Sequence, residues 1–230
     1  MNLPNAITIG RIAASPLVGW LPLTPSVTYR AWAFALFVIL AVSDYWDGHL
    51  ARSRNSITDL GKQLDPLADK LFLVVTMVPM YLLMRLKGPE AGIVHVATAG
   101  SLKFITPWGL VGLPLWVAIV ILGREVAMTI FRQMAANRGV VIGAIGSAKW
   151  KTGFQMVWVG AAFFWFMAAT AAEQYGWQGA ALWTYMKNFN GIVGVGCMIG
   201  AVGLTLYSLV LYMQRYGGVF LGRASAGASR

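Results

Sequence analysis

Acidic side chains are scarce in this chain, and most of them fall in one short stretch. Only eight Asp and Glu occur among 230 residues, and five of these eight lie between residues 44 and 69. Carboxylates are costly at membrane depth and repel one another when they lie close together, so such a cluster needs cations. The stretch therefore predicts a cation-binding site.

The spacing of these acids places them on two helix faces, because an α-helix turns about 100° per residue. One stripe repeats at i, i+3, i+4 and i+7 and consists of Asp44, Asp47, Gly48 and Ala51. A second stripe repeats at i, i+4 and i+8 and consists of Gly61, Asp65 and Asp69. The link from Arg54 to Thr58 is short, so the two helices should lie antiparallel with their four carboxylates converging.

The residue types indicate which cation and which ligand would fit. All the candidate ligands are hard carboxylate oxygens without His or Cys, which favours Mg²⁺ or Mn²⁺, with two ions roughly 3.5–4 Å apart. Gly48 and Ala51 leave room beside the metals, and the Arg52 guanidinium offers a fork for a phosphate oxygen. The block predicts a diphosphate site, although each residue alone could equally be a helix cap or a packing contact.

The elements that hold these residues must lie in a bilayer. The chain is 58% hydrophobic and 11% charged, with a mean hydropathy of +0.65, which excludes an ordinary water-facing surface. A membrane span needs about 20 apolar residues. The predicted fold is an all-α integral membrane protein with six transmembrane helices, at residues 5–23, 28–53, 57–86, 113–137, 147–172 and 188–215.

The distribution of basic residues predicts the orientation of these helices. With the N-terminus in the cytosol, twelve Lys and Arg fall on the cytosolic side and five on the other, as the positive-inside rule requires. This orientation puts the acidic block at the cytosolic side. The net charge of +10 is spread singly between apolar spans, so no nucleic-acid partner is expected.

The remaining segments carry no predicted chemistry. The stretch from Asn2 to Arg11 is expected to lie along the membrane interface, and Pro16, Pro22 and Pro25 are expected to break the first span. Residues 87–112 are predicted to form an external loop with a short hairpin. Residues 1–216 form one domain in this interpretation, and residues 217–230 a mobile cytosolic tail.

The full acidic pattern resembles the signature of the CDP-alcohol phosphatidyltransferase family. It runs Asp44-x-x-Asp47-Gly48-x-x-Ala51-Arg52, then, after eight residues, Gly61-x-x-x-Asp65-x-x-x-Asp69, and every specified position agrees. The resemblance implies a six-helix membrane enzyme, commonly dimeric, that moves a phosphatidyl group from a CDP-linked lipid to an alcohol and releases CMP.

The resemblance also implies roles for individual residues. The four carboxylates Asp44, Asp47, Asp65 and Asp69 would hold two metal ions, with Asp69 also the proton acceptor. The CDP-diacylglycerol would contact a set made of Gly48, Arg52 and Thr58, with the small Ala51 and Gly61 on the same two faces. No protein nucleophile is required, so we expect direct displacement at the phosphorus.

Basic residues in the second half of the chain bear on the acceptor alcohol. Four of them would gather near the acidic block and suit an acceptor that itself carries phosphate: Arg124, Arg132, Lys149 and Lys151. The competing explanations are a structural ion pair between Arg124 and Glu125 and ordinary membrane anchoring by the two lysines.

Three segments resemble the bacterial branch of this family that makes phosphatidylglycerol phosphate. They are the N-terminal Met1–Arg11 pattern, Arg124-Glu125 followed by Arg132, and Lys149-x-Lys151-Thr152-x-x-Gln155. The resemblance implies sn-glycerol 3-phosphate as acceptor and a bacterial cytoplasmic membrane as location.

Three alternatives remain open at this point. Inside the family, the acceptor could be phosphatidylglycerol, as in cardiolipin synthases, or an inositol phosphate. Outside it, converging carboxylates could carry a metal ion across the bilayer, although the acids continue into no polar path on the other side.

Overall fold

The computed structural model describes residues 3–53, 59–85, 102–138 and 147–220. At several helix ends within these ranges only the backbone is described. The helices and strands are α1 Leu3–Trp20, the 3₁₀ turn η1 Leu21–Leu23, α2 Val27–Ser53, α3 Asp59–Arg85, β1 Phe104–Thr106, β2 Gly109–Val111, α4 Leu115–Asn137, α5 Ser147–Gln174, the 3₁₀ turn η3 Trp177–Gly179 and α6 Ala181–Phe220.

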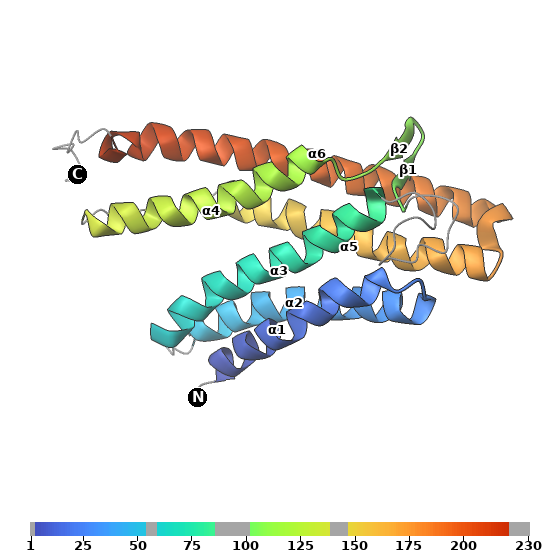
Figure 1. Cartoon of the computed structure of the whole chain (residues 1–230), viewed down its shortest axis with the longest axis horizontal. Coiled ribbons are helices and arrows are strands. Elements are labelled where there is room, and N and C mark those ends of the chain that lie inside the picture. Colours follow the sequence, from blue (N-terminus) through green and yellow to red (C-terminus); the bar gives the residue numbers. More distant parts are fainter. Residues whose placement is uncertain (1–2, 54–58, 86–101, 139–146, 221–230) are drawn as a thin grey trace.

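The six long helices run up and down in one elongated bundle (Figure 1). Helices α2 and α3 run in opposite directions, which confirms the antiparallel arrangement predicted from the short link between them. The ends of α2 and α3 that carry the acidic block lie at the same end of the bundle as the first and last described helical turns, and the β1–β2 hairpin lies toward the other end.

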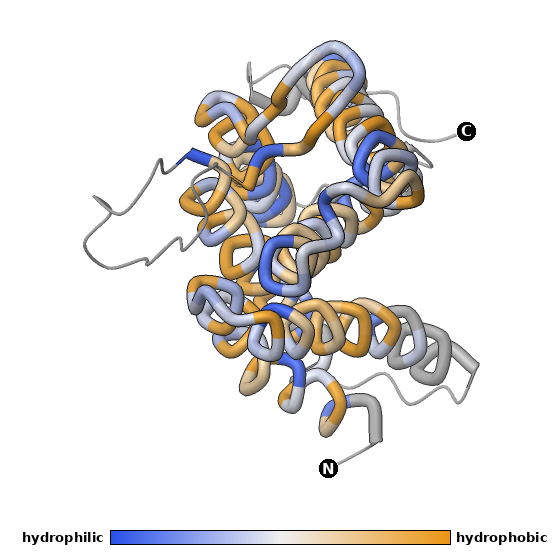
Figure 2. The backbone as a smooth tube through the Cα atoms, turned by 90° about the vertical axis from the view of Figure 1, so that its right-hand side faces the viewer, coloured by the Kyte–Doolittle hydropathy of each residue, from blue (hydrophilic) through white to orange (hydrophobic). Residues whose placement is uncertain are grey.

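Five of these helices are long and apolar enough to cross a membrane, within the part of the chain that the structure describes. They are Asn5–Leu23, Val27–Asp44, Leu64–Arg85, Trp150–Gln174 and Ala181–Tyr216. Helix α4 is of similar length but carries Arg124, Glu125 and Arg132. Hydrophobic residues (orange) recur along the helices, interspersed with hydrophilic ones (Figure 2). The protein is an all-α integral membrane protein, and the sixth span remains a prediction.

The predicted helix boundaries agree closely with the structure except in α1 and α6. Pro16 lies inside α1 without interrupting it, so the helix ends only at Trp20, before Pro22. Helix α6 begins at Ala181, seven residues before the predicted start. The prediction missed these residues because the polar side chains of the first turns lower the local hydropathy. The helix continues to Phe220, so residues 217–220 of the predicted tail are helical, and the rest of the tail lies outside the described residues.

The predicted hairpin before α4 is confirmed and packs on α6. Strands β1 and β2 are antiparallel, and Ile105 pairs with Leu110. A Cβ atom on Gly191 of α6 would stand 1.9 Å from the Ile105 carbonyl oxygen, so only glycine allows this approach. The hairpin therefore anchors the end of the bundle away from the acidic block.

An aromatic stack joins α2, α3 and α5 next to the acidic side chains. The Phe37 ring stacks on Phe72 with centroids 5.6 Å apart and on Phe163 with centroids 5.5 Å apart. All three are at most 4% exposed. Such pairs add about 0.5–1.5 kcal/mol each beyond their buried area. Because Phe72 follows Asp69 by three residues on α3, this stack fixes the helix face that presents the carboxylate.

Candidate active site

A polar stripe on α1 faces the acidic helices. Asn5, Thr8, Arg11 and Ser15 recur every three or four residues in an otherwise apolar helix, and all four are buried. The Ser15 hydroxyl donates to the Arg11 carbonyl oxygen at 2.6 Å, which satisfies it within the helix. Helix α1 packs against both α2 and α3, so the stripe lies where the acids of those two helices converge.

The Arg11 guanidinium bridges the two acidic helices. Its Nη1 donates to Asp44 Oδ1 at 2.5 Å and its Nη2 donates to Asp69 Oδ1 at 3.2 Å. Arg11 is 4% exposed, whereas the Asp69 side chain is 60% exposed. A buried guanidinium is stable only when charged partners compensate its desolvation. Arg11 therefore neutralises part of the acidic cluster from its buried side and leaves the Asp69 carboxylate accessible to a ligand.

The third described carboxylate, Asp65, joins the same region through α1. The Thr8 hydroxyl donates to Asp65 Oδ1 at 3.2 Å. Asp44 and Asp65 both lie within electrostatic range of Asp69. Three of the four predicted acids thus converge, while the side chain of Asp47 lies outside the described residues.

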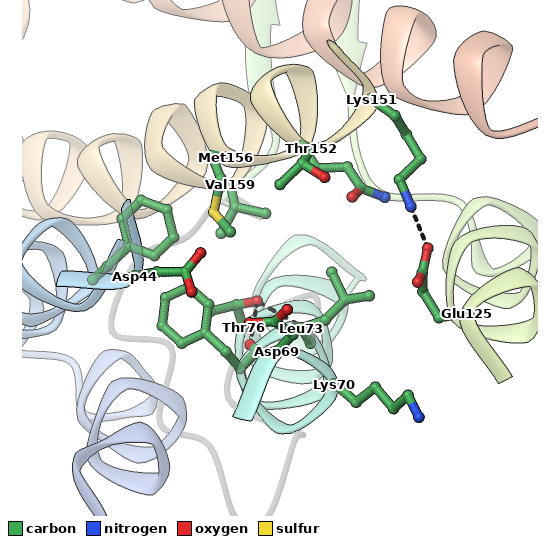
Figure 3. Close-up of a pocket in the computed structure, with 13 residues that line it drawn as sticks. Asp44, Asp69, Lys70, Leu73, Thr76, Glu125, Lys151, Thr152, Met156 and Val159 are labelled. Atoms are coloured by element: carbon green, nitrogen blue, oxygen red, sulfur yellow. Dashed lines mark hydrogen bonds and ion pairs between the residues drawn. The ribbon is translucent and has the colours of Figure 1, made fainter. Parts of the chain in front are cut away.

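Two of these carboxylates, those of Asp44 and Asp69, share a pocket of about 110 Å³ with residues of α4 and α5 (Figure 3). Asp44 and Asp69 line one side, and Glu125 and Lys151 line another. The Phe37 and Phe72 rings of the aromatic stack contribute apolar walls. The pocket therefore joins an acidic region to a basic one, which suits a ligand that needs both a cation and an anion partner.

The basic side of the pocket is organised by Glu125. Its Oε1 accepts from Lys151 Nζ and, at 3.0 Å, from Arg124 Nη1. Arg124 and Lys151 are each only 6% exposed in their side chains, and Glu125 is 26% exposed. The ion pair between Arg124 and Glu125 that the sequence offered as a competing explanation is present, and Lys151 shares it.

The four predicted acceptor residues occupy different positions. Arg124 turns toward α6, where its Nη2 donates to the Ser208 hydroxyl at 3.1 Å and its guanidinium lies 5.9 Å from the Tyr212 ring centroid. Lys151 lines the pocket. Arg132 is exposed, with its charge in range of Lys151. The Lys149 side chain lies outside the described residues.

Most of the predicted lipid-binding residues lie outside the part of the chain whose side chains the structure describes. The structure does not describe Thr58, and at positions 48, 51 and 52 it describes only the backbone. Gly61 is buried near the start of α3, one helical turn before Asp65.

The donor set fits a hard divalent cation by its chemistry. No group of three His, Cys, Asp or Glu close enough for one ion occurs among the described side chains, which do not include Asp47. Asp44 and Asp69 nevertheless present oxygens from two helices toward one positive group, Arg11. Oxygen ligands concentrated around a cation are what Mg²⁺ or Mn²⁺ would require.

Sequence reasoning missed Arg11 and Thr8 as partners of the acids. The signal was available, because Asn5, Thr8, Arg11 and Ser15 form a polar stripe at helical spacing within an apolar run. The role of Glu125 in holding Lys151 had no such signal, since the two residues are 26 positions apart on different helices.

Comparisons with known proteins identify the family of this chain. A family model described as CDP-alcohol phosphatidyltransferase matches residues 1–187. The chain is 33% identical over 173 residues to a Bacillus subtilis protein named CDP-diacylglycerol–glycerol-3-phosphate 3-phosphatidyltransferase, covering 70% of this chain and 75% of that protein. An Arabidopsis thaliana protein of the same name, numbered 1, is 30% identical over 219 residues, 94% of this chain and 62% of its own length.

A relative with a different name has a similar sequence identity to this chain. A rice (Oryza sativa subsp. japonica) cardiolipin synthase (CMP-forming) is 30% identical over 225 residues, which cover 94% of this chain and 57% of that protein. The chain thus spans less than two thirds of the Arabidopsis and rice proteins just described. The family model covers more than half of the chain and includes all four acids of the motif, so the chain belongs to the CDP-alcohol phosphatidyltransferase family.

Proposed function

We propose that this protein transfers the phosphatidyl group of CDP-diacylglycerol to sn-glycerol 3-phosphate, forming phosphatidylglycerol phosphate and CMP. The observation that carries the proposal is the pocket that places Asp44 and Asp69 on one side and Lys151 on another. The names of the Bacillus and Arabidopsis relatives support this acceptor. An acceptor with a hydroxyl at one end and a phosphate at the other matches a pocket with these two sides.

Asp69 accepts the proton in this mechanism. The 1-hydroxyl oxygen of the acceptor bonds to the lipid-side phosphorus, the bond from that phosphorus to the CMP oxygen breaks, and the hydroxyl proton passes to Asp69. Its side chain is 60% exposed, so an acceptor can reach it, and the hydrogen bond from Arg11 orients it. Direct displacement of this kind needs position and charge stabilisation more than a protein nucleophile.

The four acids Asp44, Asp47, Asp65 and Asp69 would hold the metal, as two Mg²⁺ or Mn²⁺ ions. Enzymes of this family generally use divalent metals. When bound, the ions would supply the positive charge that neutralises the diphosphate and the departing CMP. Gly48, Ala51, Arg52, Thr58 and Gly61 are the residues proposed to accommodate the CDP-lipid.

Lys151 is the residue proposed to bind the acceptor phosphate, supported by the charges of Arg124, Arg132 and Lys149. In the structure Lys151 donates to Glu125, so an incoming phosphate has to share or replace that carboxylate. Because two cations meet one carboxylate here, a net positive charge is left for an anion.

The test is an acceptor panel. Purified protein with CDP-diacylglycerol and Mg²⁺ is given glycerol 3-phosphate, phosphatidylglycerol, inositol phosphate or serine, and CMP release is measured. We expect release with glycerol 3-phosphate and little with the other acceptors. Preference for another alcohol would refute the acceptor and spare the transfer mechanism, whereas no CMP release with any of them would refute both.

Cardiolipin synthase activity is the second candidate, and the similarity to the rice protein favours it. Its acceptor is a lipid with less need for a cationic pocket, so Ala substitutions of Arg132 and Lys151 that leave CMP release intact would support it. Family membership favours a transferase over the metal-ion transporter, which metal uptake into proteoliposomes without CDP-lipid would support instead.

The setting we propose is a homodimer in the bacterial cytoplasmic membrane, with the N-terminus and the acidic end of the bundle facing the cytosol. Water-soluble glycerol 3-phosphate would then reach the pocket directly, and the lipid substrate would enter from the bilayer. Labelling of single introduced cysteines at the two ends of the bundle, after Cys197→Ser, tests the orientation.

A further inference from the structure

The proposed mechanism gives no role to Gln155, a polar residue of the pocket. Gln155 on α5 lines the pocket and is 6% exposed. Its Nε2 is buried and has no hydrogen-bond partner among the described residues. A buried amide without a partner costs about 1–3 kcal/mol, an amount that a bound ligand with a matching acceptor would recover.

Gln155 lies on the face of α5 that carries Lys151. The two residues are four positions apart, so Gln155 sits one turn, about 6 Å, further along the helix. Asp44 and Asp69 belong to the same pocket on α2 and α3. A small molecule that contacts both Lys151 and Asp69 therefore occupies the cavity that Gln155 lines.

We propose that Gln155 determines acceptor specificity by hydrogen-bonding the middle hydroxyl of glycerol 3-phosphate. The inference rests on the proposed function, because it identifies which atoms of that acceptor the pocket recognises. The phosphate binds at Lys151, the 1-hydroxyl points to Asp69, and the 2-hydroxyl lies between them beside Gln155.

The chemistry of the amide suits a hydroxyl better than the other groups in the reaction. The phosphate is an anion for which Lys151 is the stronger donor, and the attacking hydroxyl must give its proton to a carboxylate. A neutral hydroxyl both donates and accepts, as does an amide. Specificity of this kind is strong because an analogue without the hydroxyl leaves the buried amide unpaired.

The test compares glycerol 3-phosphate with 3-hydroxypropyl phosphate, which keeps the attacking hydroxyl and the phosphate but lacks the middle hydroxyl. The ratio of kcat/KM for the two acceptors is measured by CMP release. We expect the wild-type protein to prefer glycerol 3-phosphate roughly 10- to 100-fold. In Gln155→Leu that preference should fall to within about threefold, through loss of activity on glycerol 3-phosphate alone.

Two further variants keep the result interpretable. Gln178→Leu replaces an exposed glutamine in η3, away from the pocket residues, and should retain the wild-type preference. Gln155→Met has a more flexible side chain and repeats the test if the leucine variant does not fold.

Several outcomes would overturn the inference. Equal use of the two acceptors by the wild type, or an unchanged preference in both Gln155 variants, would show that Gln155 does not contact the middle hydroxyl. A higher KM for CDP-diacylglycerol alone would assign Gln155 to the nucleotide lipid. If the wild type accepts glycerol 3-phosphate in any of these cases, the proposed function stands and only the role of Gln155 fails.

Discussion

Two charged clusters meet in the pocket, and they are built in opposite ways. In the acidic cluster, Asp44 and Asp69 both accept from the Arg11 guanidinium, and Asp65 accepts from Thr8 on the same helix as Arg11. In the basic cluster, Arg124 and Lys151 converge on a single carboxylate, that of Glu125. Each cluster thus contains one opposite charge that holds it together without neutralising it.

Partial neutralisation of each cluster allows one pocket to bind unlike charges. Full neutralisation would remove the attraction for ligands, whereas no neutralisation would make burial too costly. The remaining negative charge beside Asp69 suits metal ions, and the remaining positive charge beside Lys151 suits a phosphate. The two clusters would then bind the two ends of the reaction, and four variants test that comparison.

The largest effect should come from Asp69→Asn. It keeps the size of the side chain but removes the proton acceptor, so turnover should fall by about 10²–10⁴-fold. Binding of CDP-diacylglycerol, measured by the thermal shift that the lipid produces, should remain because the other acids are intact. Glu173→Gln is the control, since Glu173 is exposed near the far end of α5. Turnover within about tenfold of wild type would mean that the proton leaves by another route.

Arg11→Leu should destabilise the acidic cluster. The substitution leaves the carboxylates of Asp44 and Asp69 without their counter-ion, and these side chains are 35% and 60% exposed. The thermal unfolding midpoint in EDTA should therefore drop, by less than the loss of a fully buried ion pair would cause. Added Mg²⁺ should restore part of the loss, because it supplies positive charge to the same carboxylates. Arg85→Leu, at the other end of α3 where Arg85 is exposed and bonds Tyr81, provides the matched comparison. An unchanged midpoint in EDTA would argue against Arg11 as the internal counter-ion.

Lys151→Met should affect the basic cluster and the acceptor only. Loss of a charged hydrogen bond to phosphate should raise the KM for glycerol 3-phosphate roughly 10- to 100-fold, with little change for CDP-diacylglycerol. The same substitution at Lys187, near the start of α6, controls for loss of a membrane-end lysine. An equal rise in the KM for glycerol 3-phosphate and the KM for CDP-diacylglycerol would mean that Lys151 maintains the structure of the pocket and does not bind the acceptor.

Arg132→Ala should have the smallest effect. Arg132 is exposed, so solvent screens its charge, and we expect the KM for glycerol 3-phosphate to rise only about two- to fivefold. The rise should shrink as the salt concentration increases, since screening weakens exposed charges first. Arg215→Ala, another exposed arginine, on α6, is the control. A large effect that salt does not change would require Arg132 to be buried when the acceptor binds.

Much of the fold could be predicted because the relevant signals are local. The predicted span 28–53 became α2 Val27–Ser53, and the predicted span 147–172 became α5 Ser147–Gln174. Apolar length fixes such helices whatever their neighbours are. The prediction failed where local signals mislead, as at Pro16, which stays inside α1, and at the polar first turns of α6.

The acidic half of the site is predictable from the sequence, because helical periodicity places Asp44, Asp65 and Asp69 on particular faces of two adjacent helices. The partners of these acids depend on how the helices pack. Arg11 reaches Asp69 across 58 positions, and Lys151 reaches Glu125 across 26, through packing of helices whose relative rotation no short pattern encodes. The basic residues Arg124 and Lys151 were predicted from the sequence, but the Glu125 carboxylate that holds them together and the buried amide of Gln155 beside Lys151 are products of helix packing.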